Sequence, residues 1–375
     1  MIYADHAATT MLSNQAKEAM LPWLCEEYAN PSTLYSLARN SRKAIADARA
    51  IIAEAIDADP DEIFFTSCGT ESDNWALLGT ALRFPCQRKR IITSCIEHHA
   101  ILHTCGFLEK LGYEVVYLPV DHSGLIKESD LRNAINDDAV LVSIMYANNE
   151  IGTIEPVWEY SRIAHEHGVL FHTDAVQIMG HEHVKVHTID VDMLSASAHK
   201  FNGPKGVGFL YLKKGTPLEP LLHGGGQEKG MRSGTENVAS IVGMAVALQE
   251  HMQSIDNEQQ YLENLRRRLI CGLHSASLDF IVNGAEKHVP GSISISFRGV
   301  DGEMLLHRLD LMGIAVTTGS ACNSKNTVLS HVIKAIAVPE AYAKGTIRIT
   351  LGMDNNEEQV DKIVASLRKI LTRPL

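Results

Sequence analysis

Short apolar runs alternate with amphipathic segments over the first two thirds of the chain, and this alternation predicts strands and helices. Apolar positions at helical spacing predict a helix over residues 14–28 and a longer helix that ends near residue 56. Strands are expected at 63–65, 90–93, 114–118, 139–144, 170–172, 193–195 and 207–212. Helices are expected at 71–82, 99–111, 131–135 and 157–167. Strands joined by such helices predict right-handed βαβ units and a mostly parallel sheet, with a ligand site at the carboxyl ends of its strands.

The pattern changes after residue 235, where a long amphipathic stretch over 238–273 predicts connecting helices. Further strands are expected at 280–282, 292–297 and 347–350, and helices at 303–312 and 357–371. We therefore predict an α/β protein with two domains. The large domain is expected to span residues 15–250, and the small α+β domain to combine residues 1–14 with residues 251–375.

Composition narrows the class of protein. The 375 residues are 45% hydrophobic and carry a net charge of −11, which argues against direct binding of nucleic acid. The chain has no apolar run near the ~18 residues of a membrane span, and its start does not have the pattern of a signal peptide. Its seven cysteines include no CxxC pair. We therefore expect reduced thiols and a cytoplasmic protein without a membrane or nucleic-acid partner.

Two charged residues follow predicted strands, at the edge where a ligand is expected. Lys200 comes shortly after strand 193–195, and a lysine held there can form a Schiff base if its surroundings lower its pKa. Taken alone, Lys200 also fits a solvated loop lysine. Asp174 follows strand 170–172, where a carboxylate can pair with a protonated pyridine nitrogen or can instead cap a helix.

Small residues between strand 63–65 and the next helix suggest an anion site. The segment Thr66–Ser72 can present backbone N–H groups to a phosphate at a helix start. Its spacing matches neither GxxxxGK[ST] nor GxGxxG, and the run Gly224–Gly226 is not a dinucleotide fingerprint either. A nucleotide-binding loop is therefore not indicated, and the segment taken alone is a weak signal.

A single thiol lies in a loop of small and polar residues. Cys322 is preceded by Gly319 and Ser320 and followed by Asn323, whereas structural cysteines usually lie among apolar neighbours. This pattern favours a reactive thiol. The 18 histidines include His99 and His103 at helical spacing, but the chain has no HExxH motif and no cysteine pair, so no metal site is expected.

Taken together and in order, these segments resemble the NifS/IscS cysteine desulfurases, which use pyridoxal 5′-phosphate. The resemblance covers nearly the whole chain. It is carried by the segments 5–10, 30–32, 66–74, 97–99, 148–152, 174–177, 197–200, 224–227, 232–235, 318–322 and 346–350. It implies a transferase of fold type I with a central seven-stranded sheet, a smaller domain and a homodimer.

The resemblance also implies how the cofactor is held. Lys200 would bind it covalently, Asp174 would pair with the pyridine nitrogen, His98 would stack on the ring and act in catalysis, and Gln177 would donate to the phenolic oxygen. The residues expected at the phosphate are Gly69, Thr70, Ser197, His199 and, from the opposite subunit, Thr235.

The remaining implied roles concern L-cysteine. Asn149 would contact both cofactor and substrate, and Arg348 would hold the substrate carboxylate. Lys200 would move the α-proton while the Cys322 thiolate attacks the substrate sulfur, which gives L-alanine and a Cys322 persulfide. The persulfide sulfur would pass to an acceptor protein in iron–sulfur cluster assembly or in tRNA or DNA sulfur modification. Whether Cys322 also ligates a cluster transiently is left open.

The chain departs from the family pattern in four places. His6 stands where an aromatic residue or Asn is common, Cys68 where glycine is frequent, and Met353 where many members have arginine. The fourth is the absence after Leu375 of the tail that docks the iron–sulfur scaffold, which leads us to expect a specialised acceptor. The alternatives are a selenocysteine lyase, an aminotransferase in which Cys322 is incidental, and a sulfur-carrier subunit without turnover.

Overall fold

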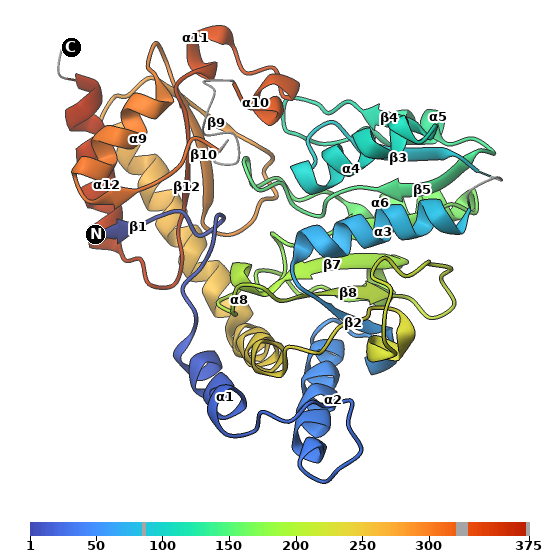
Figure 1. Ribbon diagram of the computed structural model, residues 1–375. Helices are drawn as coiled ribbons and strands as arrows, with labels where there is room; N and C mark the ends of the chain where they lie inside the picture. The colour runs from blue at the N-terminus through green and yellow to red at the C-terminus, as the bar shows by residue number, and fades with distance from the viewer. Residues whose placement is uncertain (85–87, 320–328, 373–375) are drawn as a thin grey trace.

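The computed structural model describes residues 1–84, 88–319 and 329–372, and its largest sheet has seven strands (Figure 1). The strand order is β2-β8-β7-β6-β5-β3-β4. The strands span Ile63–Thr66 (β2), Arg90–Ser94 (β3), Glu114–Leu118 (β4), Ala139–Ser143 (β5), Leu170–Asp174 (β6), Met193–Ser197 (β7) and Gly208–Leu212 (β8). The pairs from β7 to β4 are parallel, whereas β8 pairs antiparallel with β7 and β2. The predicted mostly parallel sheet is confirmed.

Helices cover both faces of this sheet, which explains why its central strands are apolar almost throughout. Ile91 and Leu141 pack with Trp75 on one face, and the next residues along the same strands, Ile92 and Val142, pack in the core on the other face. The helices of this part span Asn14–Cys25 (α1), Ala38–Ala55 (α2), Gly69–Arg83 (α3), His99–Lys110 (α4), Glu128–Ala134 (α5), Val157–Glu166 (α6) and Val186–Ile189 (α7), with short 3₁₀ turns at Pro60–Glu62 (η1), Ala198–Lys200 (η2) and Gln227–Gly230 (η3).

The second part of the molecule is built around a three-stranded antiparallel sheet of order β12-β10-β9. Its strands span Phe280–Asn283 (β9), Ser292–Phe297 (β10) and Thr346–Thr350 (β12), and its helices Gly302–Leu311 (α9), His331–Ala335 (α10), Glu340–Ala343 (α11) and Glu357–Thr372 (α12). The N-terminal strand Ile2–Tyr3 (β1) pairs in parallel with Ile314–Ala315 (β11), so the start of the chain joins this part.

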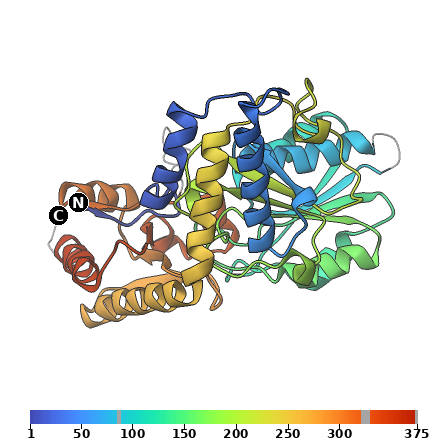
Figure 2. The same cartoon turned by 90° about the horizontal axis from the view of Figure 1, so that it is seen from below.

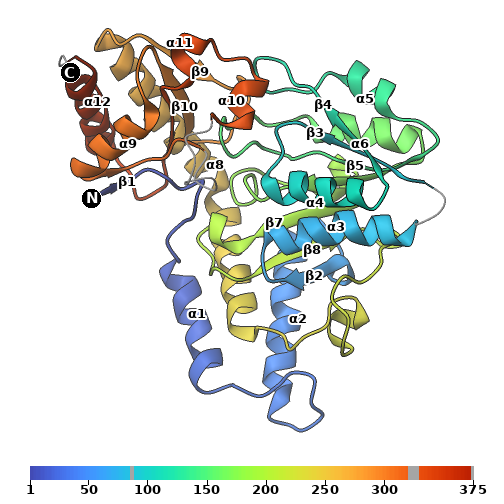
Figure 3. The same cartoon turned by 45° about the horizontal axis from the view of Figure 1, so that its top comes forward.

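One helix of 38 residues, Val238–Ser275 (α8), runs between the two parts (Figures 2 and 3). Met244 near its start packs in the core of the large sheet, and Leu265 and Leu269 near its end pack in the second core. The prediction of several connecting helices over this stretch is wrong, because the apolar stripe continues through the polar centre of the segment. In the described ranges, no helix is both long and apolar enough to cross a membrane.

All seven predicted strands of the large sheet are present, and all but β4 differ from the prediction at one end. β6 continues to Asp174 and β7 to Ser197, two residues further than their apolar runs. Backbone pairing with β7 extends β6 through Thr173 and Asp174, and pairing with β8 extends β7 through Ala196 and Ser197. Polar side chains end a hydrophobic pattern, but they do not prevent a ladder of backbone hydrogen bonds.

Candidate active site

A cavity of about 260 Å³ lies at the carboxyl ends of β6 and β7, beside residues of the second sheet. Ten of the predicted site residues line it, namely Gly69, Thr70, His98, Asn149, Asp174, Gln177, Ser197, His199, Lys200 and Arg348. Residues that are up to 279 positions apart in the sequence thus share one cavity, at the sheet edge that parallel topology predicts.

Lys200 reaches this cavity because a 3₁₀ turn, Ala198–Lys200, follows β7 directly. Its Nζ donates to the carbonyl oxygens of Ala7 and Ala8, at 2.5 Å and 2.9 Å. The interpretation as a solvated loop lysine is therefore wrong. Held against the N-terminal segment, the amine is placed among the other site residues, where a nucleophilic amine is useful.

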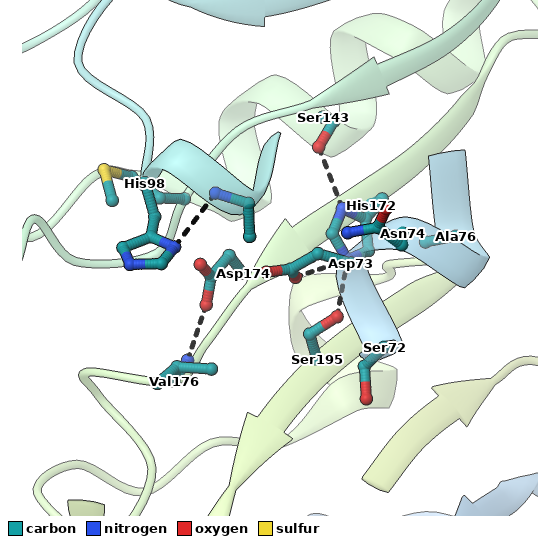
Figure 4. Close-up of polar contacts among 12 residues, drawn as sticks. Ser72, Asp73, Asn74, Ala76, His98, Ser143, His172, Asp174, Val176 and Ser195 are labelled. Carbon is teal, nitrogen blue, oxygen red and sulfur yellow. Dashed lines mark hydrogen bonds and ion pairs between the residues drawn. The ribbon is translucent and has the colours of Figure 1, made fainter. Parts of the chain in front are cut away.

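Asp174 ends β6 and is 5% exposed (Figure 4). The backbone N–H of Val176 donates to its Oδ1 at 2.9 Å. Burial raises the pKa of Asp174, while the Val176 N–H and the nearby Lys200 amine act in the opposite direction. No helix begins within the next few described residues, so the helix-capping alternative fails. The site holds a buried carboxylate that a cation can neutralise.

His98 is the N-cap of α4, and its Nδ1 accepts from the Ala100 N–H at 3.1 Å. Burial lowers the pKa of His98, although Asp174 acts against this. The ring is therefore neutral with its proton on Nε2, since Nδ1 serves as an acceptor. Such an aromatic ring at the cavity wall can stack on a planar ligand.

The anion end of the cavity lies at the start of α3. The N-cap residue Cys68 makes no capping bond with its side chain, and Gly69 and Thr70 form the first turn. A Cβ at Gly69 would lie 2.6 Å from Cγ2 of Val176, so this position requires glycine. His199 lies nearby and bonds the Thr9 hydroxyl through Nδ1 at 3.1 Å. Burial lowers the pKa of His199 to about 4, which keeps its ring neutral.

Arg348, on β12, supplies a cation from the second sheet. It is 4% exposed, and its guanidinium contacts Asp5 Oδ1 at 2.6 Å and the Asn149 carbonyl at 2.8 Å. Its Nε has no hydrogen-bond partner among the described residues. Gln177 contacts the same N-terminal segment, since its Nε2 donates to the Ala7 carbonyl at 3.1 Å. A guanidinium at the cavity wall suits a carboxylate ligand.

Two predicted residues are not part of this arrangement. Thr235 lines a different cavity, together with Glu228 and Arg232. Cys322 lies outside the described residues, although Gly319, three positions before it, lines the active-site cavity. The histidine pair His99 and His103 has ring centroids 5.0 Å apart, and among the residues the structure describes no three His, Cys, Asp or Glu side chains are arranged to hold a metal ion.

Sequence reasoning missed one buried acid in the cavity wall. Asp73 is 1% exposed and lines the cavity one turn after Gly69. The available signal was an aspartate at helical spacing from Gly69 and Thr70, within a segment already assigned to an anion site. That signal is weak, because helix surfaces commonly carry solvated acids.

Comparisons with known proteins agree with this geometry. The aminotransferase class-V family model matches residues 2–363. The cysteine desulfurase IscS of Dictyoglomus turgidum is 49% identical over 99% of this chain and 95% of its own. The chain belongs to the NifS/IscS cysteine desulfurases. Within this family, a solved NifS-like protein has a TM-score of 0.94 at 39% identity and covers 99% of each chain. A structure titled "SspA in complex with cysteine" has a TM-score of 0.84 at 36% identity, covering 94% of this chain and 99% of that one.

Cysteine desulfurases of this family are pyridoxal-phosphate-dependent enzymes, as the resemblance implied. The cavity fits that cofactor. It combines a lysine amine, a buried carboxylate and a helix start at which Gly69 leaves the space a side chain would fill. The predicted family, fold and cofactor are thus confirmed.

Proposed function

We propose that this protein removes sulfur from L-cysteine and releases L-alanine, with the persulfide formed on Cys322. The observation that carries the proposal is the convergence of the Lys200 amine, the Asp174 carboxylate and the Arg348 guanidinium in one cavity. Gly319 lines the same cavity, which brings the start of the segment containing Cys322 to the reacting groups. The family relationship supports the same reaction.

The residue roles follow from the chemistry of each group. Bound pyridoxal phosphate supplies an electron sink for the carbon skeleton of the substrate. Lys200 would hold it covalently, Asp174 would keep its ring nitrogen protonated, and the neutral His98 ring would stack on it. Gln177 would donate to its phenolic oxygen. The phosphate would be bound by Gly69, Thr70, Ser197 and His199, joined by Thr235 of a second subunit in a homodimer.

The substrate would be held by its carboxylate. Arg348 would offer its guanidinium and Asn149 its side-chain amide, since both residues line the cavity. Once the cofactor is no longer bonded to it, the Lys200 amine can take the α-proton of the substrate and return it later. Asp5 and the Asn149 carbonyl hold the guanidinium rigidly, so little rotamer entropy is lost on binding.

The sulfur of the substrate is transferred to Cys322 without the electron pair of the C–S bond. The Cys322 thiolate attacks the sulfur of L-cysteine, an S–S bond forms, and the C–S bond breaks with its electron pair on carbon. Protonation of that carbon leads to L-alanine. The persulfide then transfers its sulfur to an acceptor protein of iron–sulfur cluster assembly or of tRNA or DNA sulfur modification, and a thiol is regenerated.

The proposal also includes the division of the chain into two domains and its location in the cell. The two hydrophobic cores that share α8 support a large domain over 15–250 and a small domain of 1–14 with 251–375. The scattered cysteines suit a reducing cytoplasm.

The proposal predicts that the purified protein makes alanine and sulfide from L-cysteine in the presence of a reductant. Cys322→Ala should lower both rates roughly 100-fold or more, as expected when a nucleophile is removed. Cys271→Ala, which changes an exposed thiol on α8, is the matched control and should leave both rates unchanged. Steady-state assays of alanine and sulfide measure the effect. Equal alanine production by wild type and Cys322→Ala would contradict the persulfide mechanism and favour a lyase or aminotransferase.

A further inference from the structure

Behind Asp174 lies a buried polar group that the proposed reaction does not use. It consists of Asp73 on α3, His172 on β6, Ser143 on β5 and Ser195 on β7 (Figure 4). The Asp73 carboxyl group lies between Asp174 and His172 in this view. Side chains from four neighbouring elements thus surround Asp73, and a buried acid is not what hydrophobic packing requires at this position.

His172 does not supply a positive charge to this group. Its side chain is fully buried, and its Nδ1 and Nε2 bond the hydroxyls of Ser143 and Ser195 at 2.8 Å and 2.9 Å. A neutral imidazole satisfies both contacts, with one nitrogen donating and the other accepting. Burial also lowers the pKa of His172 to about 3. The ring is therefore neutral at physiological pH.

Asp73 has little to stabilise a negative charge. Neither of its oxygens has a hydrogen-bond partner among the described residues, and Oδ1 lies 3.8 Å from Nε2 of His172, too far for a hydrogen bond. The Ser195 hydroxyl favours the charged form. Burial, Asp174, Glu97 and Cys68 all disfavour it and raise the pKa of Asp73 well above its usual range. An isolated carboxylate at this depth would instead take up a proton.

Asp174 has more neighbouring groups that stabilise a negative charge than Asp73 has. It accepts the Val176 N–H, and the nearby Lys200 amine favours its charged form. Two buried carboxyl groups side by side do not ionise together, and the proton goes to the one with fewer partners. In this pair that acid is Asp73.

We infer that Asp73 is a positioning residue that keeps a protonated, neutral carboxyl group behind Asp174. Asp174 alone then bears the negative charge available to the ring nitrogen of the cofactor. This inference deepens the proposed function and depends on the cofactor roles given there. A neutral carboxyl group carries an O–H that can be donated to the neighbouring Asp174 carboxylate, and it does not compete for the positive charge of the ring.

The direct test is an infrared difference spectrum between the wild-type holoenzyme and Asp73→Asn. The wild type should show the carbonyl stretch of a protonated carboxylic acid that Asp73→Asn lacks. Glu155→Gln is the matched control: Glu155 is also buried, but Asp174 is not among the groups acting on it. It should remove a different acid band and leave that of Asp73 in place. If wild type minus Asp73→Asn contains no acid band, Asp73 is ionised and the inference is wrong.

A second measurement separates a charge from a neutral hydrogen-bonding group. Asn resembles a protonated carboxyl group, so Asp73→Asn should keep the visible spectrum of bound cofactor and a dissociation constant within about threefold of wild type. Asp73→Leu removes the O–H that the inference assigns to the Asp174 carboxylate in the holoenzyme, and it should weaken cofactor binding at least about tenfold. Glu155→Gln should bind cofactor as the wild type does.

Each outcome of the binding measurement is informative. Equal losses in Asp73→Asn and Asp73→Leu would show that a charge is needed, and unchanged binding by Asp73→Leu would show that Asp73 only fills space. Either result overturns the inference. If Asp73→Leu does not fold, Asp73→Asn and the infrared band still decide. A wild-type protein that binds no pyridoxal phosphate would instead contradict the proposed function.

Discussion

At the scale of single residues, the site depends on polar side chains that are held in place by hydrogen bonds to other protein groups. Lys200 is held by two backbone carbonyls, and Asp174 by one backbone N–H. Arg348 is held by Asp5 and by the Asn149 carbonyl. Each contact fixes a side chain before any ligand arrives. Orientation is then a property of the protein and costs little during the reaction.

Arg348→Lys is expected to raise the KM for L-cysteine by roughly tenfold or more, with a smaller change in kcat. Lysine keeps the charge, but it loses the planar guanidinium that contacts Asp5 and the Asn149 carbonyl and that can bind a carboxylate through two N–H groups. Steady-state kinetics measure the effect. Arg298→Lys, which changes an exposed arginine paired with Asp279, is the control and should leave KM unaltered. An unchanged KM in Arg348→Lys would remove Arg348 from the substrate site.

At the scale of elements, the ends of strands and the starts of helices provide the chemistry. β6 and β7 end in Asp174 and Ser197, and α3 and α4 begin beside them with Gly69 and with His98 as N-cap. The hydrophobic pattern predicts that these elements exist and in what order. It ends β6 and β7 two residues too early, because pairing of backbone groups continues under polar side chains.

Gly69→Ala is expected to weaken pyridoxal phosphate binding by about tenfold, because the new Cβ meets the Val176 side chain and shifts the first turn of α3. Titration of the apoprotein with cofactor measures this. Gly106→Ala is the matched control within α4, where the nearest atom to a new Cβ is Glu109 Oε2 at 3.9 Å. It should bind cofactor normally and gain roughly 0.5–1 kcal/mol in the free energy of unfolding. Normal binding by Gly69→Ala would show that the helix start does not hold the cofactor.

At the scale of the whole molecule, α8 joins two hydrophobic cores, and the active site draws on both. Asp174 ends a strand of the large sheet and Lys200 lies in the turn that follows β7, whereas Arg348 lies in the three-stranded sheet. A change in one core should therefore affect the other through the shared helix.

Leu265→Ala, at the second core, is expected to lower the free energy of unfolding by about 2–5 kcal/mol through the cavity it leaves. Tryptophan fluorescence reports on the other part, since buried Trp75 lies in a core of the large sheet. The fluorescence transition and the loss of circular dichroism should move together in a thermal melt. A fluorescence transition that stays at the wild-type temperature would show that the two cores unfold independently.

The sequence by itself determined the order of strands and helices, the mostly parallel sheet and ten residues of the cavity. The elements could be predicted because hydrophobic periodicity is a local property of the chain, and the cavity residues because each belongs to a short sequence motif. Only the tertiary structure decided that residues 238–275 form one helix, that Asp5 holds Arg348, and that Asp73 lies behind Asp174. These features depend on which distant groups share a buried space. Burial determines how much free energy a charged group costs and whether it needs a partner. The burial of a given group depends on distant parts of the chain, so it cannot be read from the local sequence pattern.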